Sequence, residues 1–527
     1  MDPSSLSLIP PLLVLAFAFF AQSIIPALIL GIIVAGSIAT HSLSIASVHL
    51  IIQRLQEQLL DIDTLHMFGF LLIIGIIVTL INHLGGTFTL TQLVTRKAKS
   101  TRTVEYISLL LSTTLSLDDY LSSLTVGHVI QPLTKIYHIS RERLAYLIHS
   151  MAGPLVIITP ISSFMAYITT QLDQTGITKT PVSSSKIYIE PFFAYLNIIP
   201  FTFYSLLTLL SVWYVVQTRI NFNHPRPSFL DELSLLNHAP QAVSQKQSIL
   251  NLFLPLMLLI FCTIIGILYQ GQSTLFGGPH SLIESFQYAQ TSRILFYAAL
   301  CTLCISFCYG MIRYPTSFSL PSTQSIVTHG IRLMLPALIM VILASTFGLL
   351  LRKDLMTGHY LAHFVLYNVP TPIIPALIFI TSLSIALTTG SSWATIAVMF
   401  PIVLPLLLSL AQLEQATALS PDALPLLFPA LGAILSGAIA GDHISPLSET
   451  TLMSANSAGC SPLQHASTQF PYTIPPIIGS IIAFLAVGYL ATSRYNSAII
   501  IILPLILGFA SCLLLFTVLS RYYNRMR

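Results

Sequence analysis

Long apolar runs with almost no charge constrain this chain more than any other feature. The run ALPLLFPALGAILSGAIA, residues 423–440, has no charged side chain, and similar runs recur between residues 6 and 520. Runs of about 20 residues are what an α-helix needs to cross the hydrocarbon core of a bilayer. Only 8% of the 527 residues are charged and the mean hydropathy is +0.82, whereas a soluble domain has about 25% charged residues. The sequence therefore predicts a multi-pass membrane protein with the lipid bilayer as its partner.

The predicted fold is all-α, because a backbone inside a bilayer must satisfy its own hydrogen bonds. We expect about 12 to 15 membrane elements in a single transporter domain over 1–527. Its first half covers about 67–217, with a re-entrant hairpin at 105–133. Its second half covers about 328–491, with a broken segment at 371–411 and a hairpin at 425–456. The region 218–327 connects the two halves.

Composition and motifs exclude several classes of function. The net charge of +4 is small and does not indicate nucleic acid as a partner. The six cysteines lie within or beside apolar runs, so they do not read as a disulfide framework. The chain has no Gly-rich phosphate loop and no His/Cys metal framework, so we expect no resident cofactor and no ATP-driven pumping.

Two basic clusters predict where the first hairpin lies. By the positive-inside rule, RKAKSTR (96–102) and TKIYHISRER (134–143) are cytoplasmic. The stretch between them is too short for two full spans. It must therefore enter and leave on one side, with its tip near Asp118, Asp119 and Tyr120.

An internal repeat is the second organising feature. DYLSSLT (119–125) aligns with DHISPLS (442–448), and LGGTFT (84–89) aligns more weakly with TGSSWAT (389–395). Many secondary transporters consist of two inverted halves whose discontinuous helices meet near the membrane midplane. The repeat therefore favours two inverted repeats with re-entrant hairpins and broken helices.

Four of the 18 acidic residues lie in or beside apolar segments, namely Asp118, Asp119, Asp442 and Glu449. A charged side chain at a helix centre costs roughly 2.5–3.5 kcal/mol, and function is the default hypothesis for such a group. We predict that these carboxylates bind ions. The alternative is a carboxylate that caps a helix or, at Glu449, one that faces water at a hairpin mouth.

Hydroxyl side chains near these carboxylates complete a candidate cation site. The candidates are Ser122, Ser445, Ser448 and Thr450. Hydroxyl and carboxylate oxygens are hard ligands that suit Na⁺, and we place the ion at Asp119 and Asp442. A buried carboxylate binds either H⁺ or Na⁺, so competition alone would give exchange. The alternative role of the hydroxyls is bonding to the helix backbone.

Histidines and a second polar break supply further candidates. His149 lies inside an apolar helix and His443 adjoins Asp442, so both are candidate proton or substrate ligands. TGSSWAT splits a long apolar run. There Ser391 and Ser392 suit a helix break, and Trp393 is a candidate for lining a substrate cavity.

These stretches together resemble the NhaC family of Na⁺/H⁺ antiporters. The resemblance rests on LSLDDYLSSLTVGHVIQPL (115–133), ISRERLAYLIHSMAGPLVIITPISSF (139–164), TTGSSWATIAVMFPIVLP (388–405) and GAIAGDHISPLSETTLMSA (437–455). It implies a dimer-forming carrier whose two inverted halves surround a midplane site, transporting Na⁺ and H⁺. We expect a location in the inner membrane of a bacterium.

The sequence also departs from the family pattern. His149 stands where the family has Asp, Glu449 stands where Asp is usual, and Ala344-Ser345-Thr346 replaces an expected Ala-Trp motif. These departures favour an alternative, a Na⁺- or H⁺-coupled carrier of an amino acid or carboxylate. An intramembrane enzyme is a third class, in which an Asp pair would supply general acid and base. The chain lacks a nucleophile or metal framework, so we predict that it is not an enzyme.

Overall fold

The computed structural model describes most of the chain as helices. The described residues are 5–21, 24–42, 44–86, 89, 97–178, 186–222, 248–315, 318–357, 360, 369–413, 419–493 and 497–526. The α-helices up to the middle of the chain are α1 (Ile9–Ala21), α2 (Ile24–Ala39), α3 (Ile45–Leu59), α4 (Ile62–His83), α6 (Thr101–Thr114), α7 (Asp119–Ile136), α8 (Arg141–Ile158), α9 (Ser163–Thr175), α10 (Pro191–Ile198) and α11 (Phe203–Thr218).

The later α-helices are α12 (Leu250–Gln270), α13 (Leu282–Tyr288), α14 (Thr291–Arg313), α15 (Leu320–Leu349), α17 (Ile374–Thr389), α18 (Ser392–Leu410), α19 (Leu427–Ile444), α20 (Glu449–Ala458), α21 (Pro462–Thr492) and α22 (Ser497–Met526). Short 3₁₀ helices are η1 (Ser5–Leu8), η2 (Ile199–Phe201), η5 (Thr274–Phe276), η8 (Thr371–Ile373) and η9 (Pro421–Ala423), and η7 (Leu350–Asp354) is a π-helix.

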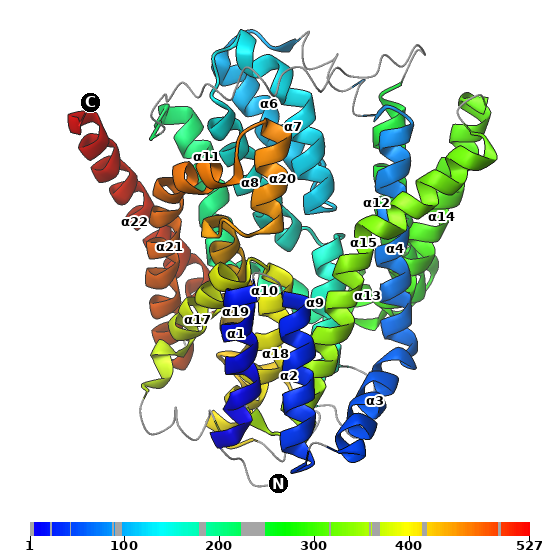
Figure 1. Ribbon diagram of the computed structural model, residues 1–527, viewed down its shortest axis with the longest axis vertical. Coiled ribbons are helices and arrows are strands. Elements are labelled where there is room, and N and C mark those ends of the chain that lie inside the picture. Colours follow the sequence, from blue (N-terminus) through cyan, green and yellow to red (C-terminus); the bar gives the residue numbers. More distant parts are fainter. Residues whose placement is uncertain are drawn as a thin grey trace.

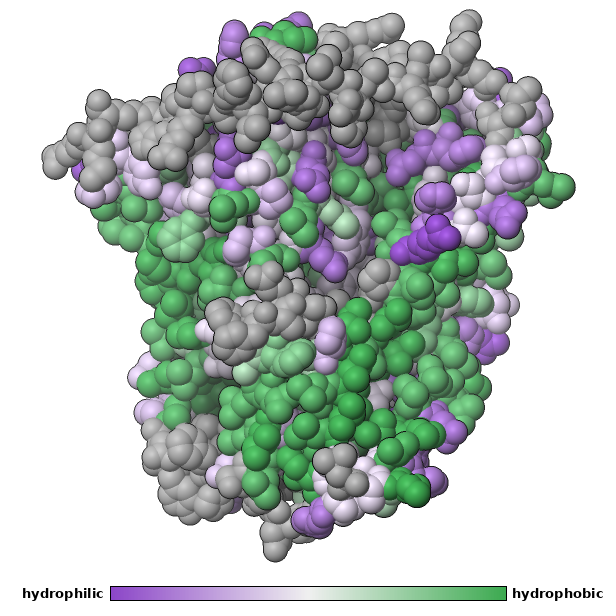
Figure 2. Space-filling view, in the orientation of Figure 1, coloured by the Kyte–Doolittle hydropathy of each residue, from purple (hydrophilic) through white to green (hydrophobic). Residues whose placement is uncertain are grey.

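Length and composition make this a multi-pass membrane protein. Among the described residues, 8 helices are long and apolar enough to cross a membrane, or up to 10 if each bent pair counts as one span. Hydrophobic residues dominate the middle of the face seen in Figure 2, and hydrophilic residues gather toward its two ends. The predicted connecting region 218–327 includes two of these spans, α12 and α14. The predicted all-α, multi-pass fold is confirmed.

Two pairs of helices turn back on themselves. Helices α6 and α7 cover the predicted hairpin 105–133 and lie in the upper half of Figure 1, whereas α17 and α18 lie in the lower half. Each second helix begins with a side-chain cap that accepts a bond from its first turn, Asp118 for α7 and Ser391 for α18. Such caps satisfy N–H groups that a helix start leaves without partners.

Each hairpin is followed by a broken helix. Helices α8 and α9 are bent by 45° at their break. They pass from the upper to the lower half of Figure 1, whereas α19 and α20 pass from the lower to the upper half. Helix α20 packs against α7 and α8, while α19 packs against α17 and α18. The two halves of the core therefore run in opposite directions.

This arrangement corrects two predictions for the second half. The segment 425–456 is a broken pair, α19 and α20, rather than a hairpin, and the hairpin is instead the segment 371–411, which contains α17 and α18. The two matching motifs, 119–125 and 442–448, therefore lie at different kinds of place, the first at a hairpin tip and the second at a helix break. Both places need the same local chemistry, a capping side chain that starts a new helix, so the motif does not reveal which way the chain then runs.

Each hairpin tip contacts the break of the broken helix that follows it. In the first half, the Ser163 N–H donates to the Leu117 carbonyl at 3.0 Å. In the second half, Gly390 has a φ of +66°, and a Cβ there would come within 2.9 Å of the Leu447 backbone. Backbone that leaves a helix inside a membrane protein must be buried in protein or lie beside water, and these contacts provide the protein cover.

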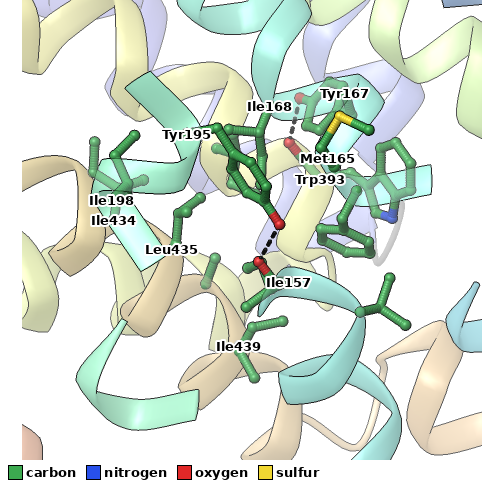
Figure 3. Packing of buried hydrophobic residues seen from close by; sticks show 14 of the residues in the cluster. Ile157, Met165, Tyr167, Ile168, Tyr195, Ile198, Trp393, Ile434, Leu435 and Ile439 are labelled. Carbon is green, nitrogen blue, oxygen red and sulfur yellow. Dashed lines mark hydrogen bonds between the residues drawn. The ribbon is translucent and has the colours of Figure 1, made fainter. Parts of the chain in front are cut away.

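Tyrosine hydroxyls donate to backbone carbonyls beside these breaks. Tyr195 donates to the Ile157 carbonyl at 2.7 Å, and Tyr167 donates to the Trp393 carbonyl at 2.7 Å, both within the apolar packing of Figure 3. An unpaired carbonyl in an apolar interior is costly. Each of the two tyrosines therefore adds a hydrogen bond to the backbone beside a break.

A second group of helices, called here the outer helices, consists of α4, α12, α14 and α15. Helix α4 packs against α14 and α15, and α12 packs against α14. The outer helices contact the hairpins and broken helices at two places. Helices α4 and α15 contact α9, and α15 contacts α18. The molecule therefore has a core of hairpins and broken helices, and the long outer helices pack beside this core (Figure 1).

Candidate functional site

The tip of the first hairpin buries two adjacent carboxylates. Asp118 and Asp119 are 0% and 2% exposed. One Asp118 oxygen caps α7 by accepting from the Leu121 N–H at 3.0 Å, and Asp119 accepts from the Tyr120 N–H at 3.0 Å. The positive end of a helix dipole favours carboxylates in this position. The cap explains how the chain tolerates them, although it neutralises neither charge fully.

Oxygen atoms without hydrogen-bond partners gather at this tip. Within the part of the chain that the structure describes, the second Asp118 oxygen and the hydroxyls of Ser122, Ser123 and Ser163 are buried and have no hydrogen-bond partner. Ser163 starts α9 and still lies near enough to Asp118 to interact with its carboxylate. Buried polar atoms without partners are rare in proteins, so this tip is a candidate location for a bound cation.

The break between α19 and α20 forms a second acidic centre. The Ser448 hydroxyl donates to one Asp442 oxygen at 2.5 Å, and the Thr450 hydroxyl donates to the other. Ser448 also caps α20 by accepting from backbone N–H groups of its first turn. Asp442 is 4% exposed. The predicted grouping of Asp442 with Ser448 and Thr450 therefore exists as direct contacts.

Three histidines surround Asp442. The His149 Nε2 lies 3.3 Å from Asp442 Oδ2 and 3.0 Å from the Thr450 hydroxyl, and its Nδ1 lies 3.0 Å from the Nε2 of His465. The His149 and His443 rings meet edge to face at 4.7 Å. Donation from His465 to His149, and from His149 toward Thr450 and Asp442, satisfies all three contacts with neutral rings. The hydrogen bonds thus converge on one carboxylate.

The residues behind the histidines fix their orientation. The Tyr204 hydroxyl lies 3.0 Å from the His443 Nδ1, and the Gln469 amide donates to the His443 carbonyl at 3.0 Å. The remaining polar atoms of His443, His465 and Gln469, namely Nε2, Nδ1 and Oε1, are buried and have no partner in the described residues. These three atoms can each still make a hydrogen bond beside His149.

The two acidic centres are coupled through space. Asp119 interacts electrostatically with Asp118 and with Asp442. Asp442 has His149 as its ion-pair partner in the described residues, and that partner is charged only when protonated. The buried Arg143 does not serve this role, since it pairs with Glu105 at 2.8 Å. The site therefore gathers carboxyl groups that have no Lys or Arg partner in the described residues.

Other predicted site residues lie outside these contacts. The exposed Glu449 accepts a hydrogen bond from Tyr120, which joins α20 to the first hairpin. Ser445 donates to the Leu387 carbonyl at 3.0 Å, and Ser392 donates to the Ala438 carbonyl at 3.2 Å. Trp393 packs between Phe164 and Tyr167, with ring centroids 4.7 Å from each. These contacts connect the four side chains to neighbouring helices.

Sequence reasoning missed several residues of the site. Ser163, His465, Gln469 and Tyr204 were not predicted as site residues, although His465 is a lone ionisable group near an apolar run. The segment Ala344-Ser345-Thr346, which departs from the family pattern, makes contacts with other helices. Ser345 accepts from the Gln171 amide at 2.8 Å, and Thr346 donates to Gln58 at 3.1 Å. In the described ranges there is no group of three or more His, Cys, Asp or Glu that could hold a metal ion.

Comparisons with known proteins give one family and one fold. The model of the Na⁺/H⁺ antiporter family matches residues 155–489. A protein of Haemophilus influenzae described as uncharacterized is 28% identical over 494 residues, which cover 92% of this chain and 91% of the relative.

Two solved transporters have similar structures. MtrF of Neisseria gonorrhoeae, described as illuminating a class of antimetabolite efflux pumps, has 15% identity and a TM-score of 0.55, with 85% of each chain covered. The YdaH transporter of Alcanivorax borkumensis has 14% identity and a TM-score of 0.49, with 83% of this chain and 90% of that chain covered. At 15% identity, the likeness to MtrF shows a shared fold.

Proposed function

The chain belongs to the Na⁺/H⁺ antiporter family, whose model matches more than half of it, and from this premise we propose that it exchanges Na⁺ for H⁺ by alternating access. The family and the similarity to a transporter structure indicate a secondary transporter.

The observation that supports exchange is a group of buried carboxylates without a permanent counter-ion. Asp118, Asp119 and Asp442 are all at most 4% exposed, and their ion-pair contact in the described residues comes from a histidine rather than from Lys or Arg. An unpaired buried charge is costly. Either Na⁺ or H⁺ removes that cost, and because both act on the same oxygens, the binding of one displaces the other.

The proposed roles follow from the two acidic centres. Asp442 and Asp119 are the ion-binding carboxylates, and the hydroxyls of Ser122, Ser448 and Thr450 supply further oxygen ligands. These hydroxyls lie at the starts of α7 and α20, so the interrupted helices place them beside the carboxylates, as in other transporters with discontinuous helices. In alternating access, the paired hairpins and breaks would open this region first to one side of the membrane and then to the other.

Cellular context belongs to the same proposal. We place the protein in the inner membrane of a bacterium, since its relative comes from Haemophilus influenzae. A homodimer is the oligomeric state implied by the family resemblance.

Proteoliposomes that contain a pH-sensitive dye test the exchange directly. A Na⁺ gradient should drive proton flux in the wild type, and Asp442→Asn should abolish it. Asp422→Asn is the matched control, because Asp422 is an exposed carboxylate in η9. The absence of flux with Na⁺, Li⁺ and K⁺ in active vesicles would rule out cation exchange.

A second candidate function is an ion-coupled carrier of a small amino acid or carboxylate. It is favoured by the unused polar atoms of His443, His465 and Gln469 beside His149, which a polar solute could engage. Similarity in fold to MtrF, described in terms of antimetabolite efflux, points the same way. Thermal-shift screens with amino acids and dicarboxylates, with and without Na⁺, distinguish the two functions. Indifference to every organic solute would count against the carrier.

A further inference from the structure

A separate polar cavity lies where the outer helices meet the core. It has a volume of about 380 Å³ and is lined by residues from the start of α4, the end of α9, the start of α10 and the α13–α14 connection. Pockets for small ligands usually fall between about 300 and 1,000 Å³. None of the lining residues contacts Asp442 or the histidines around it, so the cavity is distinct from the candidate ion site.

Two carboxylates face this cavity. Asp173 of α9 and Glu190 at the start of α10 line it, and none of its described lining residues is Lys, Arg or His. Glu190 is only 9% exposed. Its oxygens accept from the Phe193 N–H at 2.8 Å and from the Thr291 hydroxyl at 3.2 Å. Each oxygen retains a lone pair, so the carboxylate can still accept a bond from a ligand.

The rest of the lining suits an organic cation better than a bare metal ion. Tyr188 and Tyr288 also line the cavity and are 48% and 51% exposed. Tyrosine faces attract ammonium groups when the ring centre lies within about 6 Å. A volume of about 380 Å³ is in the range of pockets for small organic ligands and is far more space than a dehydrated Na⁺ needs.

We propose that this cavity binds a small organic amine, with its ammonium group on Glu190 and Asp173 and its apolar part against the tyrosines. The site lies between the α9–α10 part of the core and helices α4 and α14. A ligand there would contact both groups of helices at once. The site is independent of the proposed Na⁺/H⁺ exchange.

The protonation state of Glu190 supplies a second readout. Glu190 precedes the span that starts at Pro191, and burial raises the pKa of its carboxyl to about 8. Below that pH the folded protein holds Glu190 mostly neutral, and above it mostly charged. Amine binding should therefore tighten as the pH rises from 6 to 9, while the ligand remains cationic.

Other titratable side chains lie near the cavity and bear on the pH test. Asp173 is the other acid in its described lining. His280 stacks on Tyr288 with ring centroids 3.9 Å apart, and Arg293 lies over the Tyr297 ring instead. The Glu190→Gln variant therefore assigns any pH dependence of binding to Glu190 rather than to a neighbouring group.

Calorimetry with benzylamine and its neutral analogue benzyl alcohol tests the proposal on the full-length protein in detergent. Benzylamine should give saturable heat and benzyl alcohol should not. Glu190→Gln should weaken benzylamine binding about tenfold, because it removes one partner of a buried charge pair, and it should remove most of the rise between pH 6 and 9.

Three further results decide the assignment. Asp173→Asn should also weaken binding, which covers the case that the Glu190 variant does not fold. Asp442→Asn should bind benzylamine as the wild type does, so a failure of the proposed exchange leaves this test intact. Equal binding of benzyl alcohol, no saturable heat in the wild type, or loss of binding in Asp442→Asn alone would overturn the proposal.

Discussion

The Thr450 hydroxyl bridges His149 and Asp442. Its hydroxyl donates to Asp442 Oδ2 and lies 3.0 Å from the His149 Nε2. A hydrogen bond to a charged group contributes about 1.5–3 kcal/mol. In the proposed mechanism the same hydroxyl is a Na⁺ ligand, so its removal should weaken the ion site without altering the helix around it.

Thr450→Val should raise the Na⁺ concentration for half-maximal proton flux by about tenfold, the size expected for one charge-assisted hydrogen bond. The measurement is dye-reported flux in proteoliposomes over a series of Na⁺ concentrations. Thr388→Val is the control, since the half-buried Thr388 donates its hydroxyl to carbonyls of its own helix. Identical Na⁺ dependence in both variants would remove Thr450 from the site.

Residue identity alone predicted the acidic part of the site. Asp442, Ser448 and Thr450 are close in sequence and each stands out against apolar neighbours, so local patterns reveal them. His465 and Tyr204 come from α21 and α11, and their approach to His149 and His443 depends on long-range packing. Glu190 is not among the four acidic residues that the sequence places in or beside apolar segments, yet the fold buries it.

Capping residues indicate where several helices start, but they do not indicate the direction in which the helix then runs. Capping residues such as Asp118, Ser162, Ser391 and Ser448 mark four starts. Whether the next helix turns back or continues depends on which neighbours it packs against. That is why the hairpin expected at 425–456 is a broken helix, while 371–411 holds the hairpin.

Gly390 is the position where the second hairpin depends most on its backbone. Its φ is +66°, and a Cβ added at this position would lie 2.9 Å from the Leu447 backbone, so Gly390→Ala adds both strain and a clash. Left-handed backbone costs a non-glycine residue about 1–2 kcal/mol. Gly277→Ala is a matched control, since Gly277 has φ +79° and a Cβ there would meet nothing within 4 Å.

Gly390→Ala should therefore lower the thermal-unfolding midpoint in detergent more than Gly277→Ala does, and only the former should impair transport. The difference between the two variants isolates the contact between the hairpin tip and the α19–α20 break. Equal effects of both variants would show that this contact adds nothing beyond backbone strain.

For the molecule as a whole, the basic cluster before α6 predicts which helix ends face the cytoplasm. Lys99 precedes α6 in the basic cluster, whereas Gln272 follows α12. If the region before α6 and the region before α12 are both cytoplasmic, α12 carries Gln272 to the outer side. Both side chains are exposed.

Cysteine labelling tests this topology. In a background without the six native cysteines, Gln272→Cys should react with a membrane-impermeant maleimide in intact cells, and Lys99→Cys should react only after the cells are opened. The reverse pattern would invert the molecule in the membrane while leaving its fold unchanged.

In the proposed exchange, Na⁺ and H⁺ compete for the same buried carboxylates. Calorimetric Na⁺ titration of the purified protein between pH 6 and 9 tests it most directly. One proton that competes with one Na⁺ should weaken the apparent Na⁺ affinity by up to about tenfold for each unit of falling pH, and Asp442→Asn should abolish Na⁺ binding. A Na⁺ affinity that is independent of pH, or unchanged in Asp442→Asn, would contradict the account.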